Sequence, residues 1–229
     1  MTNLSYRFLL VTDRRQTIND RAMEPFDPNL RLNELEAPLR GPAIFGNDHP
    51  VEIEIGIGKG SLLRRVAAAS PDRNFLGVER ALKYLRLAAQ RIARDGQTNI
   101  RLVRADAIYF IEKFVADDSV ALFHIYFSDP WPKKRHAKRR FFQAPTVRLL
   151  ETKTAPGGLI RIRTDVDWYF AAIADLFERE TRLLVVEKGP LPANALPPEM
   201  QTNFEIKYRA VGKTVFGLTL RKPCIGKLT

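Results

Sequence analysis

The sequence is poor in cysteine, in histidine and in long apolar runs, and each shortage excludes a class of protein. Cys224 is the only cysteine among 229 residues, which excludes an intramolecular disulfide and a cysteine-based zinc site and favours a reducing, cytoplasmic environment. The three histidines, His49, His124 and His136, lack the spacing of metal ligands, so we expect no metal. No apolar stretch approaches the roughly 18 residues of a membrane span, and Tyr6 to Val11 is too short for a signal peptide. We therefore expect a soluble protein that is neither exported nor inserted in a membrane.

Acidic residues are scarce relative to basic ones. The chain has 37 lysines and arginines against 26 aspartates and glutamates, a formal net charge of +11 and a pI near 10.0. The first 45 residues hold six residues of each sign, so the excess lies in the rest of the chain. Such a surplus favours a polyanionic partner, either a nucleic acid or an anionic membrane surface.

The order of short apolar runs predicts the fold. Residues 1–45 are rich in proline and arginine, and we expect an N-terminal arm that is partly disordered or helical. Over residues 46–229 apolar runs alternate with amphipathic segments, a pattern typical of a parallel sheet with crossover helices. Strands are expected at 51–55, 74–78, 100–104, 120–127, 158–163, 182–186 and 214–221, with helices between them, most clearly at 81–94. The prediction is one α/β domain with a mostly parallel seven-stranded sheet and helices on both faces.

A dense basic segment follows the strand expected at 120–127. It begins Ser-Asp-Pro-Trp-Pro, and six of its last eight residues, Lys133 to Arg140, are basic. This density suits phosphate groups, and Asp129 lies at the carboxyl end of the strand, where open α/β sheets bind ligands. Our interpretation is a polyanionic substrate held beside one carboxylate. The alternative is a solvated loop in which Asp129 caps the following helix.

A glycine-rich turn follows the strand expected at 51–55. Gly56, Gly58 and Gly60 stand at alternate positions, which lets a ligand approach the backbone closely. The turn matches neither the phosphate loop Gly-x-x-x-x-Gly-Lys-Ser/Thr nor Gly-x-Gly-x-x-Gly, because Ser61 stands in place of the third glycine. By itself the turn indicates a ligand site and mere tight packing equally well.

Acidic residues end four of the expected strands: Glu54, Glu79, Asp106 and Asp129. So many carboxylates at one sheet edge would repel a pyrophosphate, whereas S-adenosylmethionine carries a sulfonium, an ammonium, ribose hydroxyls and an adenine amine. We expect Glu79 to accept hydrogen bonds from the ribose hydroxyls and Asp106 from the adenine amine. The alternative for each acid is a helix cap or a turn.

Several short motifs occur in an order that is characteristic of one family. They are Phe45-Gly46-Asn47-Asp48, Ile53 to Gly60, Phe75 to Glu79, Phe127 to Arg140, Arg163-Thr164-Asp165 and Thr202-Asn203-Phe204-Glu205. From about Phe45 to the last strand the chain resembles the bacterial tRNA (guanine-N7-)-methyltransferases. The resemblance implies a Rossmann-like, S-adenosylmethionine-dependent methyltransferase fold and methylation of N7 of a guanosine in the tRNA variable loop.

The resemblance also implies roles for individual residues. The methyl donor would be held by Glu54, Gly56, Gly58, Glu79, Asp106 and Asp129. The tRNA would be engaged by Lys133, Asp165, Thr202, Asn203, Phe204 and Glu205. The long connection from about Glu187 to Lys213, which contains the last four of these, is of a length that is often functional.

The chemistry of guanine makes Asp129 the expected catalytic residue. N7 has a lone pair and no proton to lose, so its attack on a sulfonium methyl group needs alignment more than a general base. A carboxylate beside the purine accepts hydrogen bonds from the N1 and N2 edge and stabilises the cationic product. The Asp-Pro-Trp turn is related to the Asp/Asn-Pro-Pro-aromatic turn of exocyclic amino methyltransferases, with Trp131 in place of the second proline. Trp131 either stacks on a base or packs under the loop.

Other functions stay open at this point. One is methylation of an exocyclic amino group of RNA, and another is RNA binding without catalysis on the same fold. A third is a nicotinamide-dependent oxidoreductase, because Gly56 to Gly60 followed by Glu79 mimics the spacing of a ribose-binding acid. The basic side chains of Lys133 to Arg140 favour RNA, since they are predicted to contact phosphates, although Arg139 and Arg140 fit the first turn of the next helix equally well. The sequence does not determine the oligomeric state.

Overall fold

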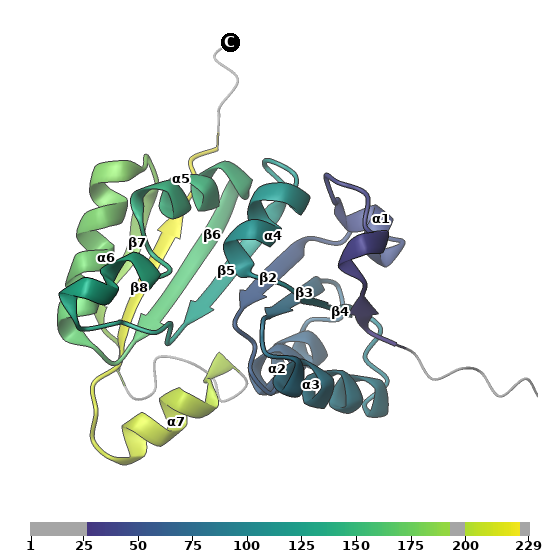
Figure 1. Ribbon diagram of the computed structural model, residues 1–229, viewed down its shortest axis with the longest axis horizontal. Coiled ribbons are helices and arrows are strands. Elements are labelled where there is room, and N and C mark those ends of the chain that lie inside the picture. Colours follow the sequence, from purple (N-terminus) through teal and green to yellow (C-terminus); the bar gives the residue numbers. More distant parts are fainter. Residues whose placement is uncertain (1–26, 193–199, 225–229) are drawn as a thin grey trace, which may run out of the picture.

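A mostly parallel sheet runs through the protein. The computed structural model describes residues 27–192 and 200–224, and within these ranges the sheet has eight strands in the order β1-β4-β3-β2-β5-β6-β8-β7 (Figure 1). The strands are β1 (Asn29–Leu30), β2 (Val51–Ile55), β3 (Asn74–Glu79), β4 (Ile100–Arg104), β5 (Val120–Tyr126), β6 (Thr154–Thr164), β7 (Leu184–Pro190) and β8 (Phe216–Arg221). The first six pair in parallel, whereas β8 pairs antiparallel with both β6 and β7.

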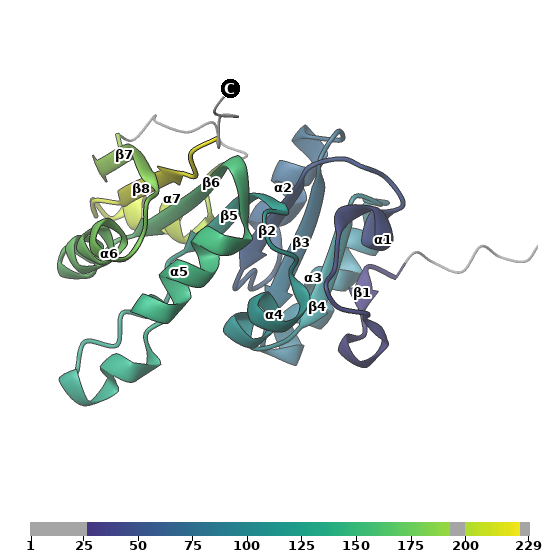
Figure 2. The ribbon, with the colours of Figure 1, turned by 90° about the horizontal axis from the view of Figure 1, so that it is seen from above.

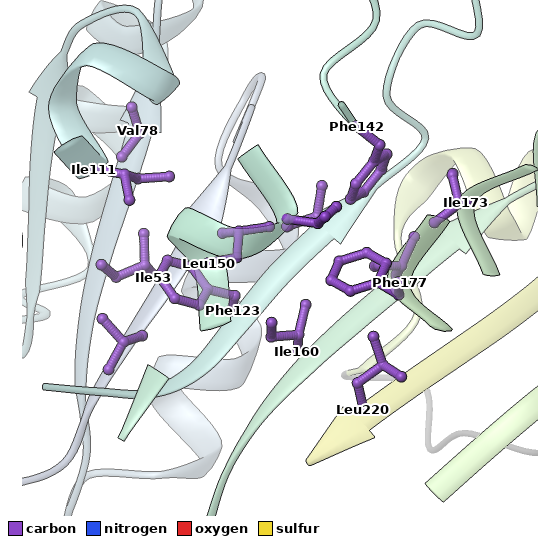
Figure 3. Packing of buried hydrophobic residues seen from close by; sticks show 14 of the residues in the cluster. Ile53, Val78, Ile111, Phe123, Phe142, Leu150, Ile160, Ile173, Phe177 and Leu220 are labelled. Atoms are coloured by element: carbon purple, nitrogen blue, oxygen red, sulfur yellow. The ribbon is translucent and has the colours of Figure 1, made fainter. Parts of the chain in front are cut away.

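Helices cover both faces of the sheet (Figures 1 and 2). They are α1 (Gly41–Phe45), α2 (Ser61–Ala69), α3 (Leu82–Arg94), α4 (Ala107–Phe114), α5 (Ala144–Lys153), α6 (Asp167–Glu180) and α7 (Asn203–Ala210), with 3-10 helices η1 (Leu32–Glu34) and η2 (Lys134–Arg139). One core lies between the sheet and α2 with α3, and the larger core lies between the sheet and α4, α5 and α6. Figure 3 shows Ile53, Phe123 and Ile160 of adjacent strands packed with Leu150 of α5 and Phe177 of α6.

The α/β prediction is confirmed, with one correction to the strand count. All seven expected strands are present, and α3 buries Leu85, Ala89 and Ile92 as its apolar stripe predicts. The eighth strand is β1, whose two residues, Asn29 and Leu30, pair with β4. A two-residue strand has no periodicity to detect, and it falls in the segment predicted to be an arm.

The segment before residue 46 is described only in part. Residues 1–26 lie outside the described residues, while residues 29–45 contain β1, η1 and α1. Leu39 is buried and forms an isolated parallel bridge with Val115, so this part of the segment packs on the body of the domain. The division of the chain at residue 45 stays a prediction.

The parallel pairing brings the predicted site to one edge of the sheet. Ile55 is paired with Val78 of β3 and with Ile125 of β5, and Glu79 is paired with Arg104 of β4. The residues that follow the carboxyl ends of β2, β3, β4 and β5 therefore lie side by side.

Candidate active site

The glycine-rich turn between β2 and α2 needs its glycines for different reasons. Gly56 and Gly58 have φ values of 75° and 53°, a region that side chains disfavour, and a Cβ built on either would meet no atom within 4 Å. A Cβ on Gly60 would instead lie 2.9 Å from the Cβ of Ala88, so Gly60 allows α2 to pack on α3. The first two glycines thus leave open space beside the backbone, as a ligand site requires.

Glu79 ties this turn to the end of β3. One carboxylate oxygen accepts a hydrogen bond from Gly58 N at 3.0 Å, and the other accepts one from Ala81 N at 2.7 Å. Both bonds are to backbone donors, so the carboxylate is fixed in place and its remaining lone pairs are available to a ligand.

A cavity of about 550 Å³, which we call the glycine-loop cavity, lies beside this turn. Its volume is in the range that is typical of small-molecule sites. Its lining residues come from β2, the glycine turn and α2, from the end of β3 and the start of α3, from the end of β5 and from α7: Glu54, Gly56, Ile57, Gly58, Lys59, Ser61, Leu62, Glu79, Ala81, Tyr84, Tyr126, Phe127, Thr202, Asn203, Phe204 and Lys207.

Glu54 is a buried acid that lines this cavity. It is 7% exposed, and burial raises the pKa of its carboxyl group to about 8, although Arg65 and Arg163 act in the opposite direction. Without a ligand the group is therefore mostly protonated at pH 7. A cation in the cavity would stabilise its ionised form.

Tyr126 is held against the cavity by a buried polar chain. His124 Nε2 lies 2.6 Å from Glu52 Oε2, and His124 Nδ1 lies 2.8 Å from the Tyr126 hydroxyl oxygen. Burial lowers the pKa of His124, and although burial alone would raise the pKa of Glu52, its hydrogen bonds to His124 and Arg73 keep it low. A neutral imidazole that donates to Glu52 must accept the proton of the Tyr126 hydroxyl, which fixes the tyrosine ring.

The helix α7 forms one wall of the cavity, beyond the carboxyl ends of β5 and β6 (Figure 1). Thr202 caps it by accepting a hydrogen bond from Glu205 N at 2.9 Å. Asn203 Nδ2 donates to Ser61 Oγ at 3.1 Å, and the ring of Phe204 lies 6.0 Å from that of Phe127. Three of the residues predicted to engage tRNA therefore line the glycine-loop cavity.

Glu205 and Asp165 face other protein groups. The side chain of Glu205 is fully buried and lies 2.9 Å from Arg163 and 3.0 Å from Arg209. Asp165 forms an ion pair with Lys213 at 2.9 Å. In this conformation Glu205 offers no surface to a substrate, and it holds α7 in place instead.

A second cavity, of about 850 Å³, adjoins the first, and we call it the Asp129 cavity. It is lined by Glu79, Arg80, Ala81, Asp129, Trp131, Arg139 and Phe141, and thus shares Glu79 and Ala81 with the glycine-loop cavity. Asp129 is exposed, and no hydrogen bond or ion pair to its carboxylate is found among the described residues. Its charge is therefore available to a ligand.

The turn that carries Asp129 is held by Arg140. Arg140 donates to the carbonyl oxygens of Pro130 at 2.9 Å and Trp131 at 3.1 Å. Trp131 has a φ of 42°, a conformation that costs about 1 to 3 kcal/mol and persists only when its surroundings impose it. Arg139 lies over the indole, 5.1 Å from the ring centroid.

The basic segment is a 3-10 helix that projects from the body of the molecule (Figure 2). η2 ends at Arg139, with Arg140 directly after it, and α5 begins only at Ala144, so neither arginine belongs to the first turn of the next helix. Arg140 was predicted to contact a phosphate. In the structure its guanidinium instead donates hydrogen bonds to the backbone of the turn that carries Asp129. Lys133 directly precedes η2 and is exposed.

Asp106 caps a helix, which was the alternative interpretation of this residue from the sequence. Its Oδ1 accepts hydrogen bonds from Ile108 N at 3.1 Å and Tyr109 N at 3.2 Å, so it caps α4. It is not among the residues that line either cavity. The cap occupies one carboxylate oxygen, and a contact of the other with adenine stays a prediction.

The described residues contain neither a metal-binding cluster nor a membrane-spanning helix. Over residues 27–192 and 200–224, no group of three or more His, Cys, Asp or Glu side chains is arranged to hold a metal ion. In the same ranges every helix is too short or too polar to cross a bilayer.

Comparison with known proteins defines the class. The fold matches the crystal structure of a 30S ribosomal A1408 methyltransferase from an uncultured bacterium, with a TM-score of 0.55 and 17% identity over 76% of this chain and 87% of that one. A SAM dependent methyltransferase from Aquifex aeolicus gives a TM-score of 0.52 at 11% identity, over 75% and 81% of the two chains. A family model described as "Putative methyltransferase" matches residues 48–218. The fold is that of a Rossmann-like methyltransferase.

More similar relatives define the family. The chain is 37% identical to the tRNA (guanine-N(7)-)-methyltransferase of Bordetella pertussis over 185 residues, which are 81% of this chain and 72% of that one. It is 31% identical to the tRNA (guanine-N(7)-)-methyltransferase of Alcanivorax borkumensis over 94% and 91% of the two chains. The chain belongs to the tRNA (guanine-N(7)-)-methyltransferase family.

The predicted fold, enzyme class and family are thereby confirmed, and the predicted cofactor, S-adenosylmethionine, is that of the class. A nicotinamide-dependent oxidoreductase is excluded. Sequence reasoning missed several cavity residues, among them Tyr84, Tyr126, Phe127 and Lys207. Tyr126 and Phe127 were detectable, because they end the strand just before Asp129, whereas Lys207 becomes relevant only once α7 is placed beside the cavity.

Proposed function

We propose that this protein transfers the methyl group of S-adenosylmethionine to N7 of a guanosine in the variable loop of tRNA. The observation that carries the proposal is a buried acid, Glu54, in a cavity that adjoins an exposed carboxylate, Asp129. Family membership supports the choice of tRNA and of guanine N7.

The glycine-loop cavity fits the methyl donor. A buried carboxyl group whose pKa is raised to about 8 is stabilised in its ionised form by a cation, and the donor carries an ammonium group. Gly56 and Gly58 leave space beside the backbone, and the fixed carboxylate of Glu79 suits ribose hydroxyls. Asp106 is the proposed partner of the adenine amine. When bound, S-adenosylmethionine supplies an electrophilic methyl group on its sulfonium.

Asp129 is the proposed catalytic residue for the target base. Its exposed carboxylate accepts hydrogen bonds from the N1 and N2 edge of guanine, which orients N7 and stabilises the positive charge that develops on the ring. No general base is needed, because N7 has no proton to lose. Arg140 fixes the turn, so the carboxylate is positioned before the substrate arrives.

The tRNA backbone is the proposed partner of the basic residues of η2 and of Lys133. No ion pair of Lys133, Lys134, Arg135 or Lys138 is found among the described residues. These side chains are exposed, and η2 projects from the body of the molecule (Figure 2), so they are free to contact phosphates. Asp165, Thr202, Asn203 and Phe204 are the further candidates for contact with tRNA, whereas Glu205 acts through α7.

The direct test is incubation of the full chain with isotope-labelled S-adenosylmethionine and an unmodified tRNA transcript, followed by nuclease digestion and mass spectrometry. We expect labelled 7-methylguanosine in the fragment that contains the variable loop. Label in another nucleoside, or no transfer to any tRNA, would contradict the proposal.

A further inference from the structure

Two arginines each affect both Glu54 and the backbone that leads into α7, which lie on two different walls of the glycine-loop cavity. Arg65 of α2 and Arg163 of β6 both lower the pKa of Glu54, against the effect of burial. Both also donate hydrogen bonds to the backbone that leads into α7: Arg65 to the carbonyl oxygen of Gln201, and Arg163 to that of Met200 at 2.7 Å. The state of Glu54 and the position of α7 therefore depend on the same guanidinium groups.

Arg163 is the more deeply placed of the two. It is 4% exposed and lies 2.9 Å from the fully buried carboxylate of Glu205. Its guanidinium carbon lies 4.4 Å from the ring centroid of Tyr126, which lines the cavity. Removal of one partner of a buried ion pair is destabilising, and without Arg163 the buried carboxylate of Glu205 would keep only Arg209 as its ion-pair partner among the described residues.

The helix α7 depends on polar anchors because it has little apolar packing. Of its eight residues, Glu205 alone is buried, while Phe204 and Ile206 are 58% and 49% exposed. Arg163 and Arg209 both hold Glu205, and Arg209 also donates to the carbonyl oxygen of Leu191 at 3.1 Å. Loss of these anchors would release one wall of the cavity with little effect on the two hydrophobic cores.

We propose that Arg163 is a positioning residue that couples α7 to the carboxylate of Glu54, so that both walls of the glycine-loop cavity are set for the methyl donor. The inference rests on the proposed function, because the cation expected at Glu54 belongs to the donor. The groups that lower the pKa of Glu54 are the guanidinium groups of Arg65 of α2 and Arg163 of β6 and a backbone hydrogen bond from Leu63 of α2, and Glu54 in turn raises the pKa of Tyr126 of β5.

The test measures the affinity for S-adenosylhomocysteine, which keeps the ammonium group of the donor, by calorimetry of the full chain without tRNA. Affinity is measured from about pH 6 to about pH 9 for the wild type, Arg163→Gln, Arg163→Lys and Arg209→Gln. Arg209→Gln is the matched control, because Arg209 also pairs with Glu205 but does not act on Glu54. The ligand's own titration is common to all variants, so differences between the profiles report on the protein.

We expect Arg163→Gln to bind at least about tenfold more weakly at pH 7 and to need a higher pH before its affinity rises, because Glu54 ionises less readily without the nearby positive charge. Arg163→Lys should bind more weakly than the wild type, since it loses the planar fork of donors, but should keep the wild-type pH profile. Arg209→Gln should also keep that profile.

Superimposable pH profiles of affinity for Arg163→Gln and the wild type would overturn the coupling. A shift of the Arg209→Gln profile as large as that of the Arg163→Gln profile would overturn it as well. Thermal melting shows whether each variant is folded. If Arg163→Gln does not fold, Arg163→Lys decides, and wild-type affinity in that variant would overturn the proposal. Failure of the wild type to bind S-adenosylhomocysteine at all would overturn the proposed function, and this inference with it.

Discussion

The two cavities of the site differ in how far the protein has already fixed their polar groups. In the glycine-loop cavity, both oxygens of Glu79 accept backbone hydrogen bonds, Glu54 is buried and α7 is held by a buried ion pair. In the Asp129 cavity, the carboxylate is exposed and is held only through the backbone of its turn. In the first cavity the protein itself holds the polar groups in place. In the second cavity the exposed charges gain partners only when a large substrate binds.

This difference matches the two substrates. A small donor needs a preformed site in which each polar group already has its place, because the donor itself brings few contacts. A tRNA brings many phosphates, so exposed basic side chains on the projecting η2 suffice to position it. The account predicts that changes in the first cavity alter donor affinity and that changes beside the second alter turnover or tRNA affinity.

The largest expected effect is that of Asp129→Asn. Removing the negative charge beside the target base should lower kcat by at least about 100-fold, in the range found when a single electrostatic contact to a transition state is lost. The affinity for S-adenosylhomocysteine should change by less than about twofold, because Asp129 lines the other cavity. Single-turnover kinetics and calorimetry measure the two quantities, with Asp175→Asn on α6 as the control. If the variant lost donor binding and kept its turnover, Asp129 would be a residue of the donor site and not of the site for the target base.

Glu54→Gln should have the next largest effect. In the folded protein the pKa of Glu54 is raised to about 8, so the contribution of this group to the stability of the wild type is fully present below about pH 4.5 and is lost as the pH rises toward about 8. Between about pH 5 and about pH 8 this loss amounts to about 3 kcal/mol, and the variant should lack it. Urea unfolding at the two pH values measures the difference. The same variant should bind S-adenosylhomocysteine more weakly, and an unchanged pH dependence of stability would mean that Glu54 ionises freely.

Replacing Lys134, Arg135 and Lys138 together with alanine should give a smaller effect that depends on salt. The logarithm of the tRNA affinity should fall less steeply with the logarithm of salt concentration, by about two units of slope, since each lost phosphate contact contributes about 0.7 to 0.9. Turnover at saturating tRNA should stay the same. The control replaces Arg148 and Arg179, which are engaged in ion pairs with Glu180 and Asp175. Equal slopes in the wild type and the triple variant would show that η2 faces solvent in the complex.

The smallest effect is expected at Asp106, where two substitutions separate the two roles. Asp106→Ala should lower the free energy of unfolding by about 1 kcal/mol, because α4 loses its cap. Asp106→Ser should keep most of that stability, yet it should weaken donor binding as much as alanine does if the carboxylate contacts adenine. Denaturant unfolding and calorimetry make the comparison. Wild-type affinity for the donor in the serine variant would show that Asp106 caps α4 and does not contact adenine.

The parts of the structure that were predicted from the sequence depend on local pattern. Apolar runs and their spacing placed the strands and α3, and the parallel order of β2 to β5 put Glu54, Glu79 and Asp129 at one edge. Asp106 also follows a strand, at a point where a helix begins, and the structure shows that it caps α4, while its contact with adenine stays a prediction.

The parts that were not predicted depend on contacts between distant segments. The pair of Arg163 and Glu205 joins residues 42 positions apart, and no periodicity connects them. The chain from Glu52 through His124 to Tyr126 joins two strands, and its importance follows from burial. The raised pKa of Glu54 likewise follows from its desolvation in the folded protein.

The most direct test of the account uses a tRNA transcript in which 7-deazaguanosine replaces the guanosine that the enzyme methylates. This base keeps the N1 and N2 edge for Asp129 but has a carbon in place of N7, so only the nucleophile is lost. We predict that the transcript binds with the affinity of unmodified tRNA and accepts no methyl group from S-adenosylmethionine at that position. Methyl transfer to the 7-deazaguanosine would show that another atom is the nucleophile and would contradict the account.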